Sequence, residues 1–262
     1  MKHAAASLLL ALAAAGAQAV CSREFSVGVS DLGYSAYLQD GRWQGIVPEL
    51  AAEMEQRSGC RLKLSPRPRA RVLLEFEQGQ IDIVTSSMQT AERDRVGHFL
   101  PYAYTELDLI VLGDTVPRNF DELRQRHDLK LGVVRGVRLG IVLDAAVNDM
   151  LARKQAEYSP DFDNLVAKLG AGRVQAALIP SVIHTKLRRD GRLPPQAVTV
   201  DLPEAPVEPI GLYLNRSNFN ADDLRQLQLH LDALRREGWV QAAYARHAGE
   251  AEARRLFRAE AR

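Results

Sequence analysis

The chain has 262 residues, of which 46% are hydrophobic and 26% charged, the length of one large domain or two modest ones. This composition argues against a disordered chain, a collagen or a coiled coil. The 34 basic and 33 acidic side chains nearly cancel. Bulk charge therefore gives no support for a nucleic-acid or acidic-membrane partner.

The first 19 residues differ in composition from the rest and predict a signal peptide. Lys2 precedes a run of mostly Ala and Leu over residues 4–15, and Ala17-Gln18-Ala19 has the form of a cleavage site. A membrane anchor is the weaker alternative, since the run is shorter than the roughly 20 apolar residues that span a bilayer. Lipid attachment at Cys21 is also weaker, because Val20 stands where a small residue is expected. We expect cleavage after Ala19 and a soluble, exported mature chain.

Cys21 and Cys60 are the only cysteines, and an oxidising compartment favours their pairing. Each precedes a strand-like run, at residues 25–29 and 61–64, and the two runs flank a helical pattern. Parallel neighbours in such a β-α-β unit start at the same sheet edge, so the sulfurs could meet. Two buried free thiols are the alternative. Two Cys and six scattered His are too few ligands for zinc, so no metal is expected.

Short apolar strands alternate with helical patterns along the chain, which is typical of a layered α/β fold. The pattern restarts after residue 130 with no low-complexity linker, which indicates two packed units. In chain order we expect strand 25–29, a helix around 46–54 that stops at Gly59, strand 61–64, a helix around 72–76 before Gly79, strand 81–84, strand 131–134, a helix near 139–151, helix 162–169, strand 176–179, strand 210–214 and a helix over 224–234 capped by Asn220.

Arginines follow three of these strands, where helix electrostatics favour acidic residues instead. Residues 66–71 are Pro-Arg-Pro-Arg-Ala-Arg, residues 90–93 are Thr-Ala-Glu-Arg, and residues 135–138 are Arg-Gly-Val-Arg. The carboxyl ends of strands in open sheets are where ligands bind. Helix N-termini and arginines directed at one crevice form an anion site.

Each of these arginines has a simpler explanation. A single arginine in a first turn is usually a solvated surface residue, and Arg67 fits that description best. Glu92 could pair with a neighbouring arginine, so that residues 90–93 would be a plain helix cap with Thr90 as the N-cap. The chain has no G-x-S-x-G, P-loop or Rossmann fingerprint, so no nucleotide cofactor is expected.

Several short motifs lie along the chain in an order and spacing that characterise one protein family. They are Gly41-Arg42-Trp43-Gln44-Gly45-Ile46 with Glu49-Leu50, Gly79-Gln80-Ile81-Asp82, Thr90-Ala91-Glu92-Arg93 followed by Phe99-Leu100-Pro101-Tyr102, Gly172-Arg173-Val174, and Glu237-Gly238-Trp239. With them the chain resembles the amino-acid-type periplasmic solute-binding proteins of bacterial ABC transporters over essentially its whole mature length.

The resemblance implies the type II periplasmic binding protein fold. This is an α/β two-lobe Venus-flytrap in which each lobe is a mostly parallel sheet flanked by helices, with two crossover segments. Lobe 1 would comprise residues 20–108 and 206–262, and lobe 2 residues 109–205. The ligand would bind in the cleft between them, and the mature protein would be a periplasmic monomer.

Carried over to this sequence, Arg93 matches the arginine that binds the ligand carboxylate in that family. Asp31 and Tyr34 also match cleft positions. With the arginines and polar residues at the neighbouring junctions, the predicted ligand-binding set is Asp31, Tyr34, Arg69, Arg71, Ser87, Met88, Arg93, Gly136, Arg138 and Ser181.

Departures from the family pattern bear on the ligand. Arg69 replaces a usual stacking aromatic, Met88 lies near a usual hydroxyl, Gly136-Val137 stands where Gly-Thr is usual, Gln175 replaces an Asp, and Pro180 stands where an acid usually receives the α-ammonium. A buried ammonium without a carboxylate partner is unfavourable by several kcal/mol. We therefore expect a small organic anion rather than an ordinary α-amino acid.

Two functions from different classes remain. The first is a binding protein that delivers its anion to an ABC permease or a membrane sensor. The second is an enzyme on the same fold, because the resemblance extends to periplasmic cyclohexadienyl dehydratases. Such a lyase needs a general acid at the leaving hydroxyl. Gln175 and Pro180 are not acids, and Asp144 and Asp149 lie on a predicted helix, so binding is favoured over catalysis.

Overall fold

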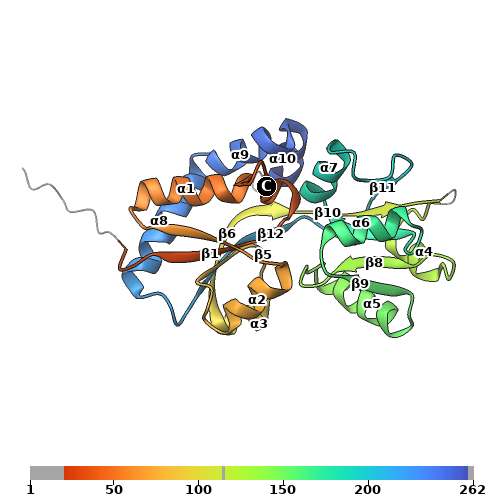
Figure 1. Ribbon diagram of the computed structural model, residues 1–262, viewed down its shortest axis with the longest axis horizontal. Helices are drawn as coiled ribbons and strands as arrows, with labels where there is room; N and C mark the ends of the chain where they lie inside the picture. Colours follow the sequence, from red (N-terminus) through yellow and green to blue (C-terminus); the bar gives the residue numbers. More distant parts are fainter. Residues whose placement is uncertain (1–20, 114–115, 259–262) are drawn as a thin grey trace, which may run out of the picture.

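The computed structural model describes residues 21–113 and 116–258, so the predicted signal peptide and its cleavage site lie outside the described residues. Two five-stranded sheets lie side by side, each flanked by helices (Figure 1). The first sheet has the order β4-β1-β5-β12-β6 and contains β1 (Phe25–Val29), β4 (Leu62–Pro66), β5 (Ile83–Met88), β6 (Gly97–Thr105) and β12 (Glu208–Asn215). The second has the order β11-β7-β10-β8-β9 and contains β7 (Leu107–Val111), β8 (Leu131–Val134), β9 (Ala156–Ser159), β10 (Ala176–Pro180) and β11 (Val198–Asp201).

We call each sheet with its helices a lobe. Lobe 1 has α1 (Ile46–Ser58), α2 (Arg69–Glu77), α3 (Ala91–Val96), α8 (Ala221–Arg236), α9 (Trp239–Ala248) and α10 (Glu250–Leu256), together with a short hairpin of β2 (Tyr37–Gln39) and β3 (Arg42–Gln44). Lobe 2 has α4 (Phe120–Gln125), α5 (Ile141–Ala152), α6 (Phe162–Gly170) and α7 (Ser181–Arg189). The predicted two-lobe α/β fold is confirmed.

The sheets are more mixed than the expected mostly parallel sheets. In each one, two strand pairs are parallel and two antiparallel. The cause is the double crossover. The chain leaves lobe 1 through β6 and returns through β12, which is antiparallel to β6. It likewise enters lobe 2 through β7 and leaves through β11, which is antiparallel to β7.

Local sequence signals account for several helix ends. Gly59 ends α1 in the left-handed region, with φ of +70°, where a side chain would be strained. Asn220 caps α8 by accepting hydrogen bonds from the backbone N–H groups of Asp222 and Asp223. Thr90 caps α3 by accepting a hydrogen bond from the backbone N–H of Arg93. The caps predicted at Asn220 and Thr90 are confirmed.

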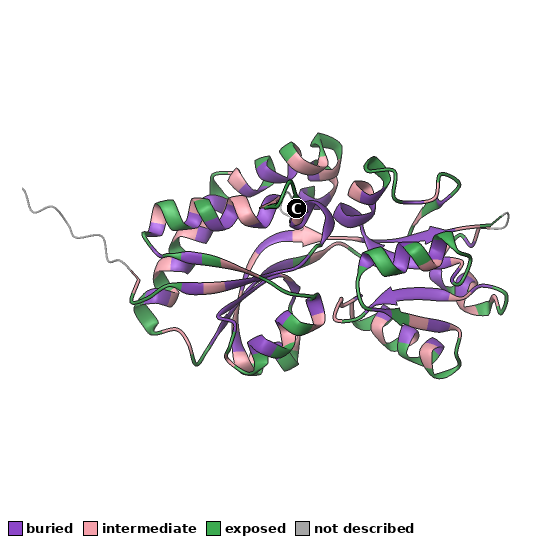
Figure 2. Ribbon diagram, in the orientation of Figure 1, coloured by how far each residue is buried: buried purple, intermediate pink, exposed green. Residues whose placement is uncertain are grey.

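Buried residues follow the strands and the inner faces of the helices in both lobes (Figure 2). In α1 they recur at the predicted helical spacing, with Ile46, Val47, Leu50, Ala51 and Met54 all buried against the first sheet. Each lobe thus closes its own apolar core and leaves polar junctions at the strand ends.

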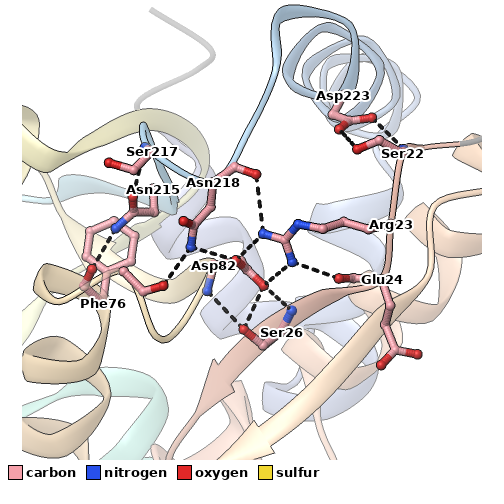
Figure 3. Close-up of polar contacts among 11 residues, drawn as sticks. Ser22, Arg23, Glu24, Ser26, Phe76, Asp82, Asn215, Ser217, Asn218 and Asp223 are labelled. Atoms are coloured by element: carbon pink, nitrogen blue, oxygen red, sulfur yellow. Dashed lines mark hydrogen bonds and ion pairs between the residues drawn. The ribbon is translucent and has the colours of Figure 1, made fainter.

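Asp82, a residue of the Gly-Gln-Ile-Asp motif, anchors the start of β5 (Figure 3). Its carboxylate accepts hydrogen bonds from the backbone N–H of Ser26 at 2.7 Å, from Arg23 at 2.5 Å and from the amide of Asn218 at 2.7 Å. Burial alone would raise the pKa of Asp82, but the hydrogen bonds from Arg23 and Ser26 lower it below its usual value. This motif residue therefore ties together β1, β5 and the turn after β12.

The predicted disulfide joins Cys21 and Cys60, whose Cα atoms lie 4.8 Å apart. Strands β1 and β4 are parallel neighbours with Phe25 opposite Leu62, so both strands begin at the same edge of the sheet. The arrangement that the β-α-β pattern predicted thus brings the two cysteines together.

Replacing both cysteines, as C21S/C60S, should lower the free energy of unfolding by about 4 kcal/mol, because a crosslink over this sequence separation restricts the unfolded chain. Urea unfolding of the variant and the oxidised native chain measures the difference. Ligand affinity should stay unchanged, since neither cysteine lies near the cavity described below. Equal stability of the two proteins would contradict a stabilising role for the bridge.

A cluster of charged side chains lies where the chain crosses between lobes. Asp108 of β7 is buried, with its Oδ2 2.5 Å from Nε2 of His184 on α7 and 3.1 Å from a guanidinium nitrogen of Arg255 on α10. Arg255 also lies 3.3 Å from a carboxylate oxygen of Glu106, in the crossover itself. Burial alone would raise the pKa of Asp108, but the hydrogen bonds from His184 and Arg255 lower it. The C-terminal helix is thereby tied to the first strand of lobe 2.

The substitution D108N should destabilise the protein by roughly 3 kcal/mol at neutral pH, because it removes the partner of the buried His184 and the half-buried Arg255. A carboxyl with a lowered folded pKa stabilises above its unfolded pKa of about 3.9, and loses that contribution as the pH falls through the folded value. The difference between D108N and the native chain should therefore shrink below about pH 4.

Denaturant unfolding between pH 3 and pH 7 measures this difference. The exposed pair of Asp128 and Arg126 provides a control, because D128N removes a carboxylate from a surface ion pair and should change stability little. A pH-independent difference for D108N would show that the charge of Asp108 is not what stabilises the crossover.

Candidate functional site

A cavity of about 530 Å³, its open side included, lies between the two lobes. Lobe 1 contributes the ends of β5, β6 and β12, the first turns of α2 and α3, and the loop after β1. Lobe 2 contributes β7, the loop after β8, and the junction of β10 with α7. The lining residues are Leu32, Ser35, Arg69, Ser86, Met88, Arg93, Thr105, Leu107, Val137, Arg138, Pro180, Val182, Ile183 and Ile210.

Arg93 lies in the first turn of α3, where the Thr90 cap fixes the start of the helix. Its residue surface is only 8% exposed, and one guanidinium nitrogen donates to the carbonyl of Met88 at 3.0 Å. Burial is the main reason that the pKa of Arg93 is lowered, and the charge of Arg138 adds to it. Among the described residues no carboxylate lies within ion-pair distance of Arg93.

Arg69 begins α2 directly after Pro68 and is 6% exposed. Its guanidinium donates to the carbonyl of Thr85 at 2.9 Å, to the carbonyl of Ser86 at 3.2 Å and to Oγ of Ser87 at 2.9 Å. Burial, and next the nearby charge of Arg93, lowers the pKa of Arg69 to about 9. It stays charged at neutral pH, and within the described part of the chain it too has no carboxylate partner.

Ser86 was not among the predicted ligand residues, but it lines the cavity. Its φ of +50° is in the left-handed region, and its Oγ lies 3.0 Å from the hydroxyl of Tyr102. The predicted neighbour Ser87 instead accepts from Arg69 and is not in the lining. Strand alternation could not decide between adjacent serines, because the positive φ of Ser86 interrupts the regular geometry of β5.

Arg138 lines the cavity from lobe 2, but its charge is already compensated. It forms ion pairs with Glu92 of lobe 1 and, at 3.5 Å, with Asp144 of α5. Arg138 thus differs from the prediction that places it with the arginines that face the ligand. The structure leaves Arg69 and Arg93 as the two lining arginines without an acidic partner in the described residues.

Arg71 and Asp31 lie outside this cavity. The side chain of Arg71 is 56% exposed and donates to Glu75 at 2.5 Å, one turn further along α2. Asp31 is exposed and lines an adjoining hollow together with Trp43 and Phe162, and this hollow shares Leu32 and Arg69 with the cavity. For Arg71 the helical spacing to Glu75 was the signal that an i,i+4 pair would form.

Three more predicted residues serve the contact between lobes or the fold. The hydroxyl of Tyr34 accepts from Arg189 of α7 at 3.3 Å. Gly136, with φ of +81°, packs against the first turn of α2 at Ala70. Ser181 is fully buried at the start of α7, and its backbone N–H donates to the carbonyl of Glu106. Of the predicted set, the cavity lining therefore contains Arg69, Met88, Arg93 and Arg138.

The wall that lobe 2 provides is apolar. Leu107, Val137, Pro180, Val182 and Ile183 line it, and none was predicted as a ligand residue. Apolar residues at strand ends look like ordinary core positions in a sequence. Only their placement opposite the arginines of lobe 1 distinguishes them.

No three His, Cys, Asp or Glu side chains are grouped to hold a metal ion within residues 21–113 and 116–258. In the same ranges no helix has both the length and the apolar character needed to cross a membrane.

A cavity between two α/β lobes connected by a double crossover defines a ligand-binding fold, and comparison with known proteins agrees. The family model of bacterial extracellular solute-binding proteins, family 3, matches residues 26–250, and the chain belongs to this family. Comparison with curated proteins at the sequence level gives no match.

Three solved structures illustrate the shared fold. The arginine-, lysine-, histidine-binding protein ArtJ from the thermophilic bacterium Geobacillus stearothermophilus has a TM-score of 0.73 at 15% identity, over 87% of this chain and 96% of its own. A histidine kinase sensor domain with similarity to periplasmic binding proteins has 0.71 at 18%, over 87% and 96%. The ancestral amino acid-binding protein AncCDT-1, a precursor of cyclohexadienyl dehydratase, has 0.69 at 19%, over 86% and 95%.

Gly33 is where the lobes approach each other beside the cavity. It has φ of +59°, and a Cβ added there would lie 2.5 Å from Cα of Ile183 and 2.7 Å from the carbonyl oxygen of Val182, both on α7. Gly41 also has a positive φ, of +74°, but a Cβ there would meet nothing within 4 Å. The two glycines therefore differ in the contact between lobes and not in backbone strain.

The substitution G33A should force the lobes apart and weaken ligand binding in the cavity by at least about tenfold, because backbone atoms cannot yield to a clash. G41A should lose only about 1–2 kcal/mol of stability, from its strained backbone. Calorimetric titration and small-angle scattering of both variants measure affinity and overall size. Equal effects of the two substitutions would show that this contact does not hold the lobes together.

Proposed function

We propose that this protein captures a small organic anion between its two lobes and delivers it to an ABC permease or a membrane sensor. One observation carries the proposal. Arg69 and Arg93 are both buried in the lining of one cavity, and no described carboxylate pairs with either. Buried charges are normally paired, so the cavity is suited to a ligand that supplies the missing negative charge.

Family membership supports the transport role, since the matched family consists of extracellular solute-binding proteins. The similarity to a histidine kinase sensor domain supports the alternative that the ligand is delivered to a membrane sensor. The expected signal peptide and the disulfide fit a periplasmic location, because disulfides persist in oxidising compartments. We propose that the mature chain begins after Ala19 and acts as a monomer.

The composition of the cavity supports binding over a lyase reaction. Its lining has no Asp, Glu, His, Lys, Cys or Tyr side chain. A dehydratase must protonate the departing hydroxyl, and these are the side chains that do so. Arginines and hydroxyls can hold an anion, but they supply no acid that operates near neutral pH.

The substitution R93M should abolish binding of organic anions, with a loss of at least about a hundredfold in affinity, because a charge-assisted contact in a closed cavity is removed. R71M is the matched control, since Arg71 is on a neighbouring junction but pairs with Glu75 at the surface. It should leave affinity unchanged. Unfolding of each variant confirms that the fold is retained.

The measurement begins with a thermal-shift panel of carboxylates, dicarboxylates and zwitterionic amino acids, because a ligand at 100 times its dissociation constant adds about 2.7 kcal/mol to stability. Calorimetry of the strongest anion with R93M and R71M follows. Tight binding of a zwitterion such as L-glutamine, with no response to any organic anion, would contradict the proposal. Equal affinity of R93M and the native chain would contradict the role of Arg93.

A further inference from the structure

Arg69 and Arg93 together have more N–H groups without a partner among the described residues than one carboxylate can accept. A guanidinium has five N–H groups. Arg69 directs three of its five at Thr85, Ser86 and Ser87, and Arg93 directs one of its five at Met88, so six remain. A carboxylate offers about four acceptor positions. A ligand that uses this site fully therefore carries a further acceptor oxygen next to its carboxylate.

The atom bonded to the carboxylate carbon must suit two neighbouring cations. A 2-ammonium group would add a third positive charge beside Arg69 and Arg93, and the cavity lining has no Asp or Glu to receive it. A 2-oxo oxygen is an acceptor without charge, so it can take up the donors that the carboxylate leaves free.

The remainder of the ligand faces apolar side chains. Leu107, Pro180, Val182 and Ile183 form the wall from lobe 2, and Ile210 lies on the side of lobe 1. A charged or strongly polar group against this wall would lose its hydration without gaining a partner. A short branched hydrocarbon chain suits it instead.

A second carboxylate on the ligand has no free cation to bind. The third arginine of the lining, Arg138, is held by Glu92 and Asp144. A second negative charge near Arg138 would meet those two carboxylates, and like charges in a closed cavity repel. The cavity therefore selects against dicarboxylates.

From these four features we propose that the ligand is a 2-oxo monocarboxylate with a short branched apolar chain. The proposal rests on the proposed function and narrows it from organic anions in general to one class. Arg69 and Arg93 bind the carboxylate and the 2-oxo oxygen, and the wall from lobe 2 covers the hydrocarbon chain. The absence of Asp and Glu from the cavity lining is what excludes the corresponding amino acid.

Four compounds with nearly the same shape test each feature by calorimetric titration of the native chain. The probe is 4-methyl-2-oxopentanoate. L-Leucine replaces the oxo group with ammonium, 4-methylpentanoate removes it, and freshly dissolved oxaloacetate replaces the branched end with a carboxylate. The probe should bind at least about tenfold more tightly than each of the others, since each lacks one matched contact.

If one of the other three compounds binds as tightly as 4-methyl-2-oxopentanoate or more tightly, the inference is wrong, and the compound shows which contact was misassigned. Tighter binding of L-leucine would reveal an ammonium acceptor, and tighter binding of oxaloacetate would reveal a site for a second charge. Equal affinity for 4-methylpentanoate and the probe would show that the protein does not bind the 2-oxo oxygen. Absence of binding by the probe, with binding of another anion that R93M abolishes, would overturn the ligand class and leave the proposed function standing.

Pro180 allows a second test through specificity. It is the N-cap residue of α7, with extended backbone angles of −54° and 141°. Asp and Asn are both favoured at such a cap. P180D should therefore place a carboxylate in the lining, while P180N makes the same backbone change without the charge.

With P180D, affinity for 4-methyl-2-oxopentanoate should fall at least about tenfold and affinity for L-leucine should rise by a similar factor, because the new carboxylate repels the anion and receives the ammonium. P180N should change both by less than about threefold. Equal behaviour of P180D and P180N would overturn the role of position 180. The compound series on the native chain decides the ligand class even where P180D fails to fold.

Discussion

Two buried guanidinium groups with no acidic partner in the described residues are the constraint on which the site depends. They are tolerable because the end of β5 supplies carbonyl oxygens to both. Arg69 donates to Thr85 and Ser86, and Arg93 donates to Met88. Ser86, within the same strand, has a left-handed φ of +50°, and the carbonyls before and after this irregular backbone serve two different helices. The hydrogen bonds position the cations without pairing them, and burial together with a neighbouring arginine lowers the pKa of each.

The rest of lobe 1 fixes this strand end in place. β5 is the middle strand of the first sheet, between β1 and β12. Its start is tied by the Asp82 network to β1 and to the turn after β12, as Figure 3 shows. A motif that looks functional in the sequence thus has a structural role at one end of the strand. By fixing the start of β5, the motif also helps to hold the carboxyl end of the strand, where Arg69 and Arg93 bind its carbonyl oxygens.

The sequence predicted those features of the structure that depend on residues close together in the chain. Caps at Thr90 and Asn220, the stop at Gly59 and the pairing of Cys21 with Cys60 depend on neighbouring residues or on one β-α-β unit, and all are confirmed. The apolar wall of lobe 2 and the crossover cluster could not be predicted. They join residues far apart in the chain, and the sequence around an apolar or a single charged residue does not show which distant residue it contacts.

The arginines at the strand ends differ in the same way, by whether an acidic partner lies nearby in the chain, on the other lobe or at neither place. Arg69, Arg71 and Arg138 have similar sequence surroundings, at the start of a helix after a strand. Arg71 has Glu75 one turn away, and Arg138 finds Glu92 on the other lobe, whereas Arg69 faces only carbonyl and hydroxyl oxygens. Counting arginines therefore overestimated the positive charge of the cavity. Lobe 1 holds both uncompensated cations and lobe 2 contributes mainly hydrocarbon, so on the proposed function the anion is recognised by lobe 1. The apolar wall of lobe 2 keeps water from these charged contacts and so strengthens them.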